Sequence, residues 1–228
     1  EGFTRHGELI GDRLYVLDGE VLDQGFVTNW QVAELGSTGL RIFDVADPAN
    51  PVLICAMPTP GRPSDIAVSG DLAFIADGGT GGLLVVDLAD PTSPVITGIA
   101  ETRGLASAVA VLPDNEPPSP GTAGRGLPSA RVAVADGADG VSVYGIFGTI
   151  PDQAFAIDTD GLATDVVAWD TTLAVADGWN GVLIYDLNNP IEPFHFSVAN
   201  SAVSLTHDAS NGLLYAAQAM GGVAVFDV

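Results

Sequence analysis

One element returns five times along this chain: an apolar strand that follows a glycine and, in four copies, closes on an aspartate. The five copies are GLRIFDV (39 to 45), GLLVVDL (82 to 88), GVSVYGI (140 to 146), GVLIYDL (181 to 187) and GVAVFDV (222 to 228). Successive copies are separated by about 41 to 43 residues, except for one step of about 58. A repeat of about 40 residues that is made of short strands is typical of a β-propeller.

Within the unit that runs from Ser64 to Thr102, turn residues divide the chain into four short strands. We expect these strands at residues 65 to 69, 72 to 77, 82 to 88 and 94 to 102. The other units align to this one, which predicts an all-β fold: a propeller of about five four-stranded antiparallel blades. No strand follows the copy at 222 to 228, so the last blade is predicted to lack its outer strand.

The repeat covers the chain from end to end, so we expect one propeller domain over residues 1 to 228. The blades are expected at approximately residues 3 to 58, 64 to 102, 106 to 159, 164 to 200 and 202 to 228. Two insertions interrupt the period, at 19 to 38 and 113 to 130. The first carries Trp30 and other apolar residues and is expected to pack on a surface. The second is rich in proline and glycine and is expected to be an exposed loop.

Charge restricts the class of partner. The chain has 29 acidic residues and 7 basic ones, a net charge of −22. A surface of this sign repels phosphate, which excludes nucleic acid and anionic membranes as partners. No apolar run approaches the roughly 18 to 20 residues of a spanning helix, so we expect no direct membrane insertion. The chain begins at Glu1 rather than methionine, from which we expect a removed leader or a partial sequence, and export to the cell surface or outside the cell.

A second recurring aspartate ends the second strand of four units, and the fifth has Gln218 there. The four aspartates are Asp18, Asp77, Asp136 and Asp177. The pseudo-symmetry of a propeller would place them around one channel mouth, where a ring of carboxylates is a candidate Ca²⁺ site. Three of them precede glycine, and Asp-Gly is also a strong turn signal. The turn interpretation is favoured because a turn needed in every blade recurs in every blade; no cofactor is then required.

Other residues are candidates for partner binding. Trp30 and Trp179 are expected on the face that carries these aspartates, where exposed tryptophans anchor protein or sugar partners. Arg62 and Arg103 lie in connectors between blades on the same face; they are expected to orient an acidic group of a partner or to pair with neighbouring aspartates. Phe226, on the last strand, is a further candidate.

Two histidines offer acid–base chemistry. His6 and His207 lie near the first strand of the first and fifth units, which closure of the ring would make neighbours. A structural or surface role is the alternative. The closing aspartates of the repeated strand, such as Asp44 and Asp87, are predicted to accept hydrogen bonds from nearby backbone N–H groups.

The segments GLRIFDVADPANPV and GLLVVDLADPTSPV (residues 39 to 52 and 82 to 95) carry a family resemblance. They resemble the LVIVD repeat, a β-propeller repeat of bacterial and archaeal surface or secreted proteins. The resemblance is sharp in the first, second and fourth units and weak in the third, where Asp-Pro-x-x-Pro is lost. It implies one blade per repeat and an exported protein, and it implies no reaction.

These observations predict a non-catalytic, exported propeller that serves as a protein-binding or structural module of a cell-surface or extracellular assembly. The open edge of the last blade would accept a strand from residues 1 to 5, from a neighbouring subunit or from chain beyond Val228. One alternative is a Ca²⁺-assisted propeller hydrolase that uses the channel-mouth carboxylates with His6 or His207. A second alternative is a glycan-binding lectin that uses the two tryptophans.

Overall fold

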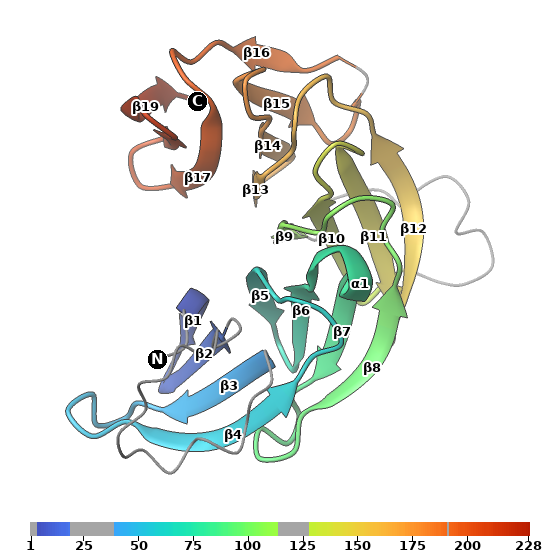
Figure 1. The fold of residues 1–228 in the computed structure, drawn as a ribbon, viewed down its shortest axis with the longest axis vertical. Coiled ribbons are helices and arrows are strands. Elements are labelled where there is room, and N and C mark those ends of the chain that lie inside the picture. Colours follow the sequence, from blue (N-terminus) through green and yellow to red (C-terminus); the bar gives the residue numbers. More distant parts are fainter. Residues whose placement is uncertain (1–3, 19–38, 114–127, 191) are drawn as a thin grey trace, which may run out of the picture.

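The computed structural model describes residues 4–18, 39–113, 128–190 and 192–228, and five antiparallel sheets follow one another along it in an arc (Figure 1). The strands of each sheet pair in chain order; four sheets have four strands and the last has three. We number the sheets as blades 1 to 5. The predicted five-bladed all-β propeller and its three-stranded last blade are thereby confirmed. The insertion at 19 to 38 with Trp30, and residues 114 to 127 of the second insertion, lie outside the described residues.

The strand bounds follow the repeat closely. Blade 1 comprises β1 (Thr4–Ile10), β2 (Arg13–Asp18), β3 (Gly39–Asp44) and β4 (Val52–Pro58). Blade 2 comprises β5 (Asp65–Ser69), β6 (Leu72–Ala76), β7 (Leu83–Asp87) and β8 (Val95–Ala100). Blade 3 comprises β9 (Ala108–Leu112), β10 (Ala130–Ala135), β11 (Val141–Phe147) and β12 (Ile150–Ile157). Blade 4 comprises β13 (Asp165–Trp169), β14 (Thr172–Ala176), β15 (Val182–Asp186) and β16 (Phe194–Phe196). Blade 5 comprises β17 (Ala202–Asp208), β18 (Leu213–Gln218) and β19 (Gly222–Asp227).

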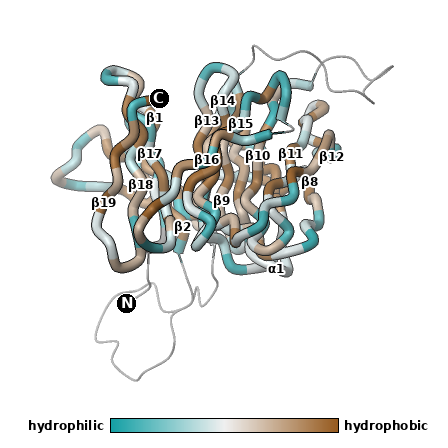
Figure 2. Tube along the Cα trace, turned by 90° about the horizontal axis from the view of Figure 1, so that it is seen from above, coloured by the Kyte–Doolittle hydropathy of each residue, from teal (hydrophilic) through white to brown (hydrophobic). Residues whose placement is uncertain are grey.

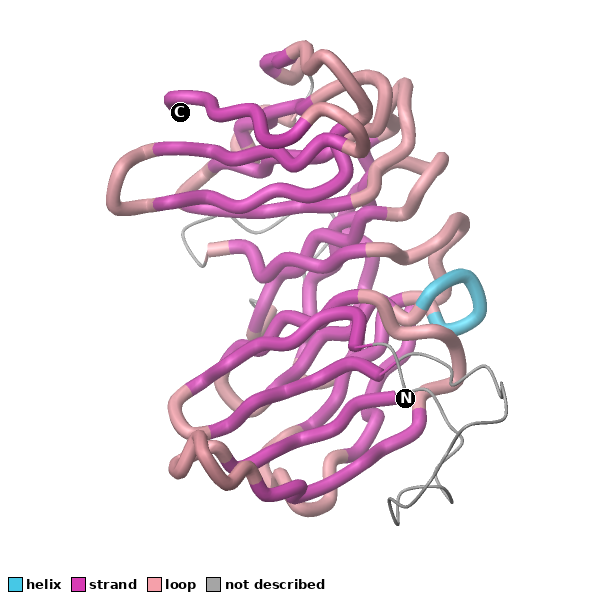
Figure 3. Tube along the Cα trace, turned by 60° about the vertical axis from the view of Figure 1, so that its left-hand side comes forward, coloured by secondary structure: helices cyan, strands magenta, loops and turns pink. Residues whose placement is uncertain are grey.

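One predicted turn has a different structure. Residues 78 to 81, expected as a turn between strands, form the single helical turn α1 (Gly78–Gly81), shown in cyan in Figure 3. Within the described residues, no helix has the length and hydropathy needed to cross a bilayer.

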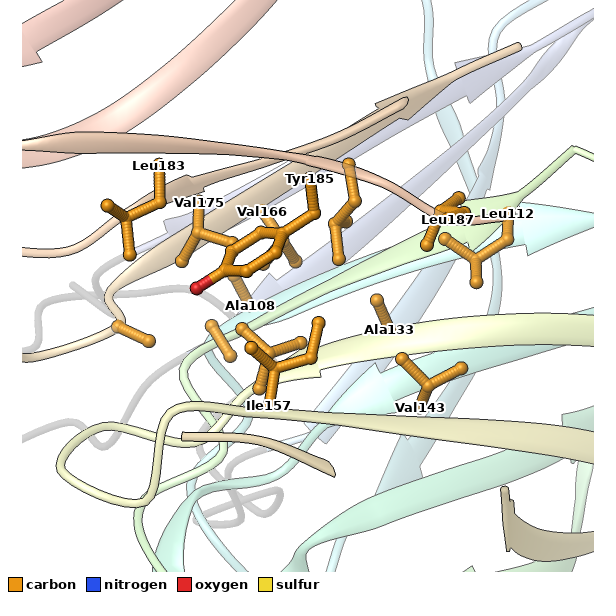
Figure 4. Packing of buried hydrophobic residues seen from close by; sticks show 14 residues of the cluster. Ala108, Leu112, Ala133, Val143, Ile157, Val166, Val175, Leu183, Tyr185 and Leu187 are labelled. Atoms are coloured by element: carbon orange, nitrogen blue, oxygen red, sulfur yellow. The ribbon is translucent and has the colours of Figure 1, made fainter. Parts of the chain in front are cut away.

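The core lies between the blades. Side chains alternate along the third strand of each blade, so that one set faces the preceding blade and the other the following blade. In blade 2, Leu84 and Val86 pack against blade 1, whereas Leu83 and Val85 pack against blade 3. Figure 2 shows the matching pattern, with hydrophobic stretches along the strands and hydrophilic residues in many of the turns. Figure 4 shows the cluster between blades 3 and 4.

Four such clusters join the five blades, between blades 1 and 2, 2 and 3, 3 and 4, and 4 and 5. The innermost strands contact one another in the same order, from β1 through β5, β9 and β13 to β17. Among the described residues no fifth cluster joins blade 5 to blade 1, and Figure 1 shows the arc open at that place. The propeller is therefore an open array with two ends.

Both ends present an apolar sheet face. On blade 5, Val223 and Val225 of β19 are 60% and 53% exposed, whereas Leu83 and Val85, at the same repeat positions of β7, are 0% exposed. On the opposite end, Leu9 of β1 is 63% exposed. These two surfaces, which we call the end faces, correspond to faces that are buried between blades elsewhere in the chain.

The closing aspartates of the repeated strand have the predicted local role. The N–H groups two residues further on, at Ala46 and Ala89, donate to Asp44 Oδ1 and Asp87 Oδ1, both at 2.9 Å. Asp186 Oδ1 accepts in the same way from the N–H of Asn188, at 3.0 Å. The turn role of these aspartates is confirmed.

Candidate functional site

The aspartates that end the second strand hold the connector that leads into their own blade. In blade 3, Asp136 is 0% exposed and its Oδ2 accepts hydrogen bonds from the backbone N–H groups of Arg103 and Gly104, both at 3.0 Å. Two further blades repeat the bond, from the Gly61 N–H to Asp77 Oδ2 at 2.6 Å and from the Gly161 N–H to Asp177 Oδ2 at 3.0 Å. We call these three residues the connector clamps.

The glycine after each clamp couples the blade to the next one. Gly78, Gly137 and Gly178 have φ values of +68°, +64° and +58°, which glycine adopts without the strain a side chain would bring. Gly78 and Gly137 form isolated antiparallel bridges to the next connector, at Ala106 and Ala163, and Gly178 forms one to Ala202, the first residue of β17. Asp-Gly recurs because one residue holds the incoming connector and the other binds the outgoing one.

The two end blades depart from this scheme. Asp18 of blade 1 forms an ion pair with Arg41 on β3 of its own blade. Gln218 of blade 5 keeps the clamp geometry with an amide, because its Oε1 accepts from the Asn200 N–H at 3.0 Å.

This geometry favours the turn interpretation over the Ca²⁺ ring. Asp77, Asp136 and Asp177 are fully buried, and each directs one carboxylate oxygen at a connector. Burial raises the pKa of Asp77, although the hydrogen bond from the Gly61 N–H acts in the opposite direction. Within residues 4–18, 39–113, 128–190 and 192–228, no three His, Cys, Asp or Glu side chains are grouped to hold a metal ion. The described contacts thus give these aspartates a structural role, and the Ca²⁺ ring remains a prediction from sequence.

Titratable groups from different blades meet along the innermost strands. His6 of β1 donates from Nδ1 to Asp65 Oδ1 of β5 at 2.9 Å, which joins blade 1 to blade 2. Asp65 Oδ2 accepts the Val109 N–H of blade 3 at 2.8 Å. Asp165 of blade 4 repeats this bond, since its Oδ2 accepts the Leu205 N–H of blade 5 at 2.7 Å. These carboxylates thus tie neighbouring inner strands together.

Several carboxylates surround His6 on these innermost strands. The hydrogen bond to Asp65 raises the pKa of His6 against its partial burial, and the charges of Glu8 and Asp165 raise it further. Burial raises the pKa of Asp165 and of Glu8. An imidazole that a carboxylate orients is an arrangement that acid–base catalysts use.

His207 does not join this group. Its ring stacks on Trp169, with centroids 4.0 Å apart and planes 14° from parallel, between blades 4 and 5. The expectation that His6 and His207 become neighbours requires a closed ring, and Figure 1 shows β1 and β17 on opposite sides of the opening.

A polar pocket of about 380 Å³ lies between blades 3 and 4. Asp158 and Asp160 line it from the connector, and Tyr185 and His195 line it from β15 and β16. Burial, together with the charges of Asp177, Asp160 and Asp158, raises the pKa of Tyr185 to about 12. The sequence interpretation missed this pocket because no motif marks it; the only signal is a connector with two acidic residues where others have one or none.

Residues 35–59, 60–102 and 160–197 match the family model of the LVIVD repeat. The chain contains LVIVD repeats. The matches fall on the first, second and fourth units, and the third unit, which lacks Asp-Pro-x-x-Pro, lies outside them. The predicted resemblance is confirmed.

Solved structures share the fold of this LVIVD-repeat chain. A candidate 6-phosphogluconolactonase from Bacteroides uniformis aligns with a TM-score of 0.68 and 14% identity, over 96% of this chain and 65% of that one. Kuenenia stuttgartiensis hydrazine synthase aligns with a TM-score of 0.58 and 21% identity, over 75% of this chain and 47% of that one. The chain thus spans less than two thirds of either structure, and at these identities the likeness shows the fold alone. No curated protein matches the chain.

The predicted partner-binding residues of the LVIVD-repeat propeller have different surroundings. Trp179 is 79% exposed in the turn after β14. Arg62 and Arg103 are exposed on connectors that the clamps hold. Phe226 is partly buried: its ring centroid lies 4.7 Å from that of Phe196 and it packs against the cluster between blades 4 and 5, and its role in partner binding stays a prediction. The exposed apolar residues of β19 are instead those of the end face.

The His6–Asp65 pair predicts a pH-dependent contribution to stability. Its hydrogen bond raises the pKa of His6 above 6.5, so the contribution is complete below that pH and is lost as the pH rises through the folded-state pKa. The His6 side chain is 46% exposed, so we expect less than about 1 kcal/mol. Urea unfolding of wild type and His6→Asn should differ at about pH 5.5 and converge at about pH 8.5. A difference that stays constant over this range would show that His6 acts by packing alone.

Proposed function

We propose that this LVIVD-repeat protein is a non-catalytic binding module that joins a neighbouring subunit at the open end of its propeller, in an assembly at the cell surface or outside the cell. The observation that carries the proposal is the end face of blade 5. Val223 and Val225 are more than half exposed at positions that are fully buried in blade 2. Burying a valine side chain is worth about 1.5 to 3 kcal/mol, so this surface favours a partner over water.

The outer edge of β19 supports the same conclusion. In blades 1 to 4 the third strand pairs with a fourth, which is β4, β8, β12 or β16. Among the described residues β19 has no such partner, so its outward N–H and C=O groups are open to strand addition. Thr4 and Arg5 lie in β1 and are not available to fill this edge. The strand we propose comes from a neighbouring subunit, with chain beyond Val228 as the alternative source.

The proposal predicts self-association that depends on the end face of blade 5. In sedimentation velocity, wild type should show concentration-dependent association, and the double variant Val223→Lys/Val225→Lys should sediment as a monomer. Leu105→Lys is the matched control, because Leu105 is 59% exposed away from the end faces; it should associate like wild type. A wild-type chain that stays monomeric at every concentration, or a double variant that associates unchanged, would overturn the proposal.

The His6–Asp65 pair favours one second candidate, a propeller hydrolase. A carboxylate-oriented imidazole lies where the inner strands of blades 1 and 2 meet. The fold is also that of a candidate lactonase. Turnover of an ester or lactone that is lost in His6→Asn would favour this candidate over the binding module, and loss with a chelator would favour its Ca²⁺-assisted form.

A further inference from the structure

The pocket between blades 3 and 4 has a composition that the other connectors do not share. Its two acidic residues flank Thr159 in the connector that precedes the Asp177 clamp. At the same positions the connector into blade 3 has Glu101 and Arg103, and the connector into blade 2 has Pro58 and Pro60. The repeat itself therefore requires no acid at either position. The paired charges belong to this pocket alone among the three clamped connectors.

A buried tyrosine and a buried hydroxyl without a partner, that of Thr159, line the same pocket. Tyr185 is 3% exposed, and its ring packs among Val175, Val166 and Ala108, with the hydroxyl directed away from Leu187 (Figure 4). Thr159 is 7% exposed, and within the described residues its Oγ1 has no hydrogen-bond partner, although a buried hydroxyl usually has one. The charges of Asp158 and Asp160 act on the Tyr185 hydroxyl. Both features point to a ligand that supplies hydrogen-bond donors to the carboxylates and contacts these hydroxyls.

The walls of the pocket suit an aliphatic stem. Leu183, Pro190 and Pro193 line it and offer no charge. His195 lies at the same surface, with its Nε2 against the carbonyl oxygen of Asn180, so the imidazole is held in place. Apolar side chains and two carboxylates in one pocket match a side chain that is apolar along its length and cationic at its tip.

We propose that this pocket binds an arginine side chain of a partner protein. The planar guanidinium carries five donors, which can serve two carboxylates and leave one for the Tyr185 hydroxyl. Anions are disfavoured by Asp158, Asp160 and the net charge of −22, which attracts cations instead. Lysine brings a compact charge with three donors that does not match paired carboxylates as well. The site lies away from both end faces, so the inference does not depend on the assembly proposed above.

N-acetyl-arginine methylamide is the probe, and its uncharged near-isostere N-acetyl-citrulline methylamide is the control ligand. Binding is followed by ¹H–¹⁵N chemical shifts of the monomeric Val223→Lys/Val225→Lys chain, so that association at the end face does not interfere. We expect saturable shifts at residues 158 to 160, 180 and 195 with the arginine probe and none with citrulline. Added salt should weaken binding. The lysine analogue should bind more weakly than arginine.

Three variants test the residues. Asp158→Asn/Asp160→Asn should weaken arginine binding at least about tenfold, because both charge-assisted bonds are lost. Tyr185→Phe should weaken it about threefold to tenfold while leaving the packed ring in place. Glu101→Gln, at the equivalent position of the neighbouring connector, should bind like wild type. Equal binding of citrulline or lysine, an unchanged affinity in the double variant, or shifts elsewhere on the chain would overturn the inference.

Discussion

Replacing Asp136 with alanine should lower the free energy of unfolding by about 3 to 5 kcal/mol. The substitution leaves two partly buried backbone N–H groups, those of Arg103 and Gly104, without the acceptor that lies 3.0 Å from each. Each hydrogen bond to a charged group is worth about 1.5 to 3 kcal/mol, and a buried donor without an acceptor carries its full desolvation penalty. Urea unfolding followed by circular dichroism measures the change.

Two further variants isolate the clamp. Asp136→Asn keeps one acceptor oxygen for the connector and removes a buried charge whose second oxygen, Oδ1, has no hydrogen-bond partner among the described residues. It should therefore cost less than about 2 kcal/mol. Asp71→Ala removes an exposed carboxylate and should change stability by no more than about 0.5 kcal/mol. If Asp136→Ala behaves like Asp71→Ala, the connector does not depend on the clamp.

Val85→Lys and Val225→Lys should differ in stability by more than about 3 kcal/mol, although both residues occupy the same position of the repeat. Val85 is 0% exposed in the cluster between blades 2 and 3, where a lysine would bury its charge without a partner or force the blades apart. Val225 is 53% exposed, so a lysine there reaches water. Val85→Lys should cost more than about 4 kcal/mol, and Val225→Lys less than about 1.

The measurement is urea unfolding of both variants at a concentration low enough for the chain to be monomeric. Val85→Ala separates the cost of the buried charge from that of lost packing, and should cost about 2 kcal/mol. A large loss in Val225→Lys would mean that something already covers this face in solution.

The repeat made much of this fold predictable. Strand positions followed from alternating apolar residues and from glycine and proline between them, and β5 lies at the predicted residues 65 to 69. The Asp-Gly pairs predicted turns, and the structure has a turn or helical turn at Gly78, Gly137 and Gly178. These features are local, so they depend on residues that are neighbours in sequence.

The rest depends on contacts between distant residues. Asp136 binds backbone 32 and 33 residues earlier in the chain, which no spacing rule for a turn reveals. The number of repeats does not fix the angle by which each blade is rotated against the next, so closure of the ring could not be predicted. The separation of His6 from His207 depends on closure, and so it could not be predicted either. Tyr185 and Asp160 come together only because β15 packs beside the connector from blade 3.

An open array has a thermodynamic consequence that a closed ring does not share. Each blade touches only its neighbours, so stability accumulates along a line and the two terminal blades have one supporting interface each, where the middle three have two. Opening fluctuations therefore begin at blades 1 and 5 and reach blade 3 last, which should appear as a gradient of amide exchange along the chain. A partner bound to an end face would give that terminal blade a second supporting interface. Binding would therefore stabilise the terminal blade and make unfolding of the chain more cooperative.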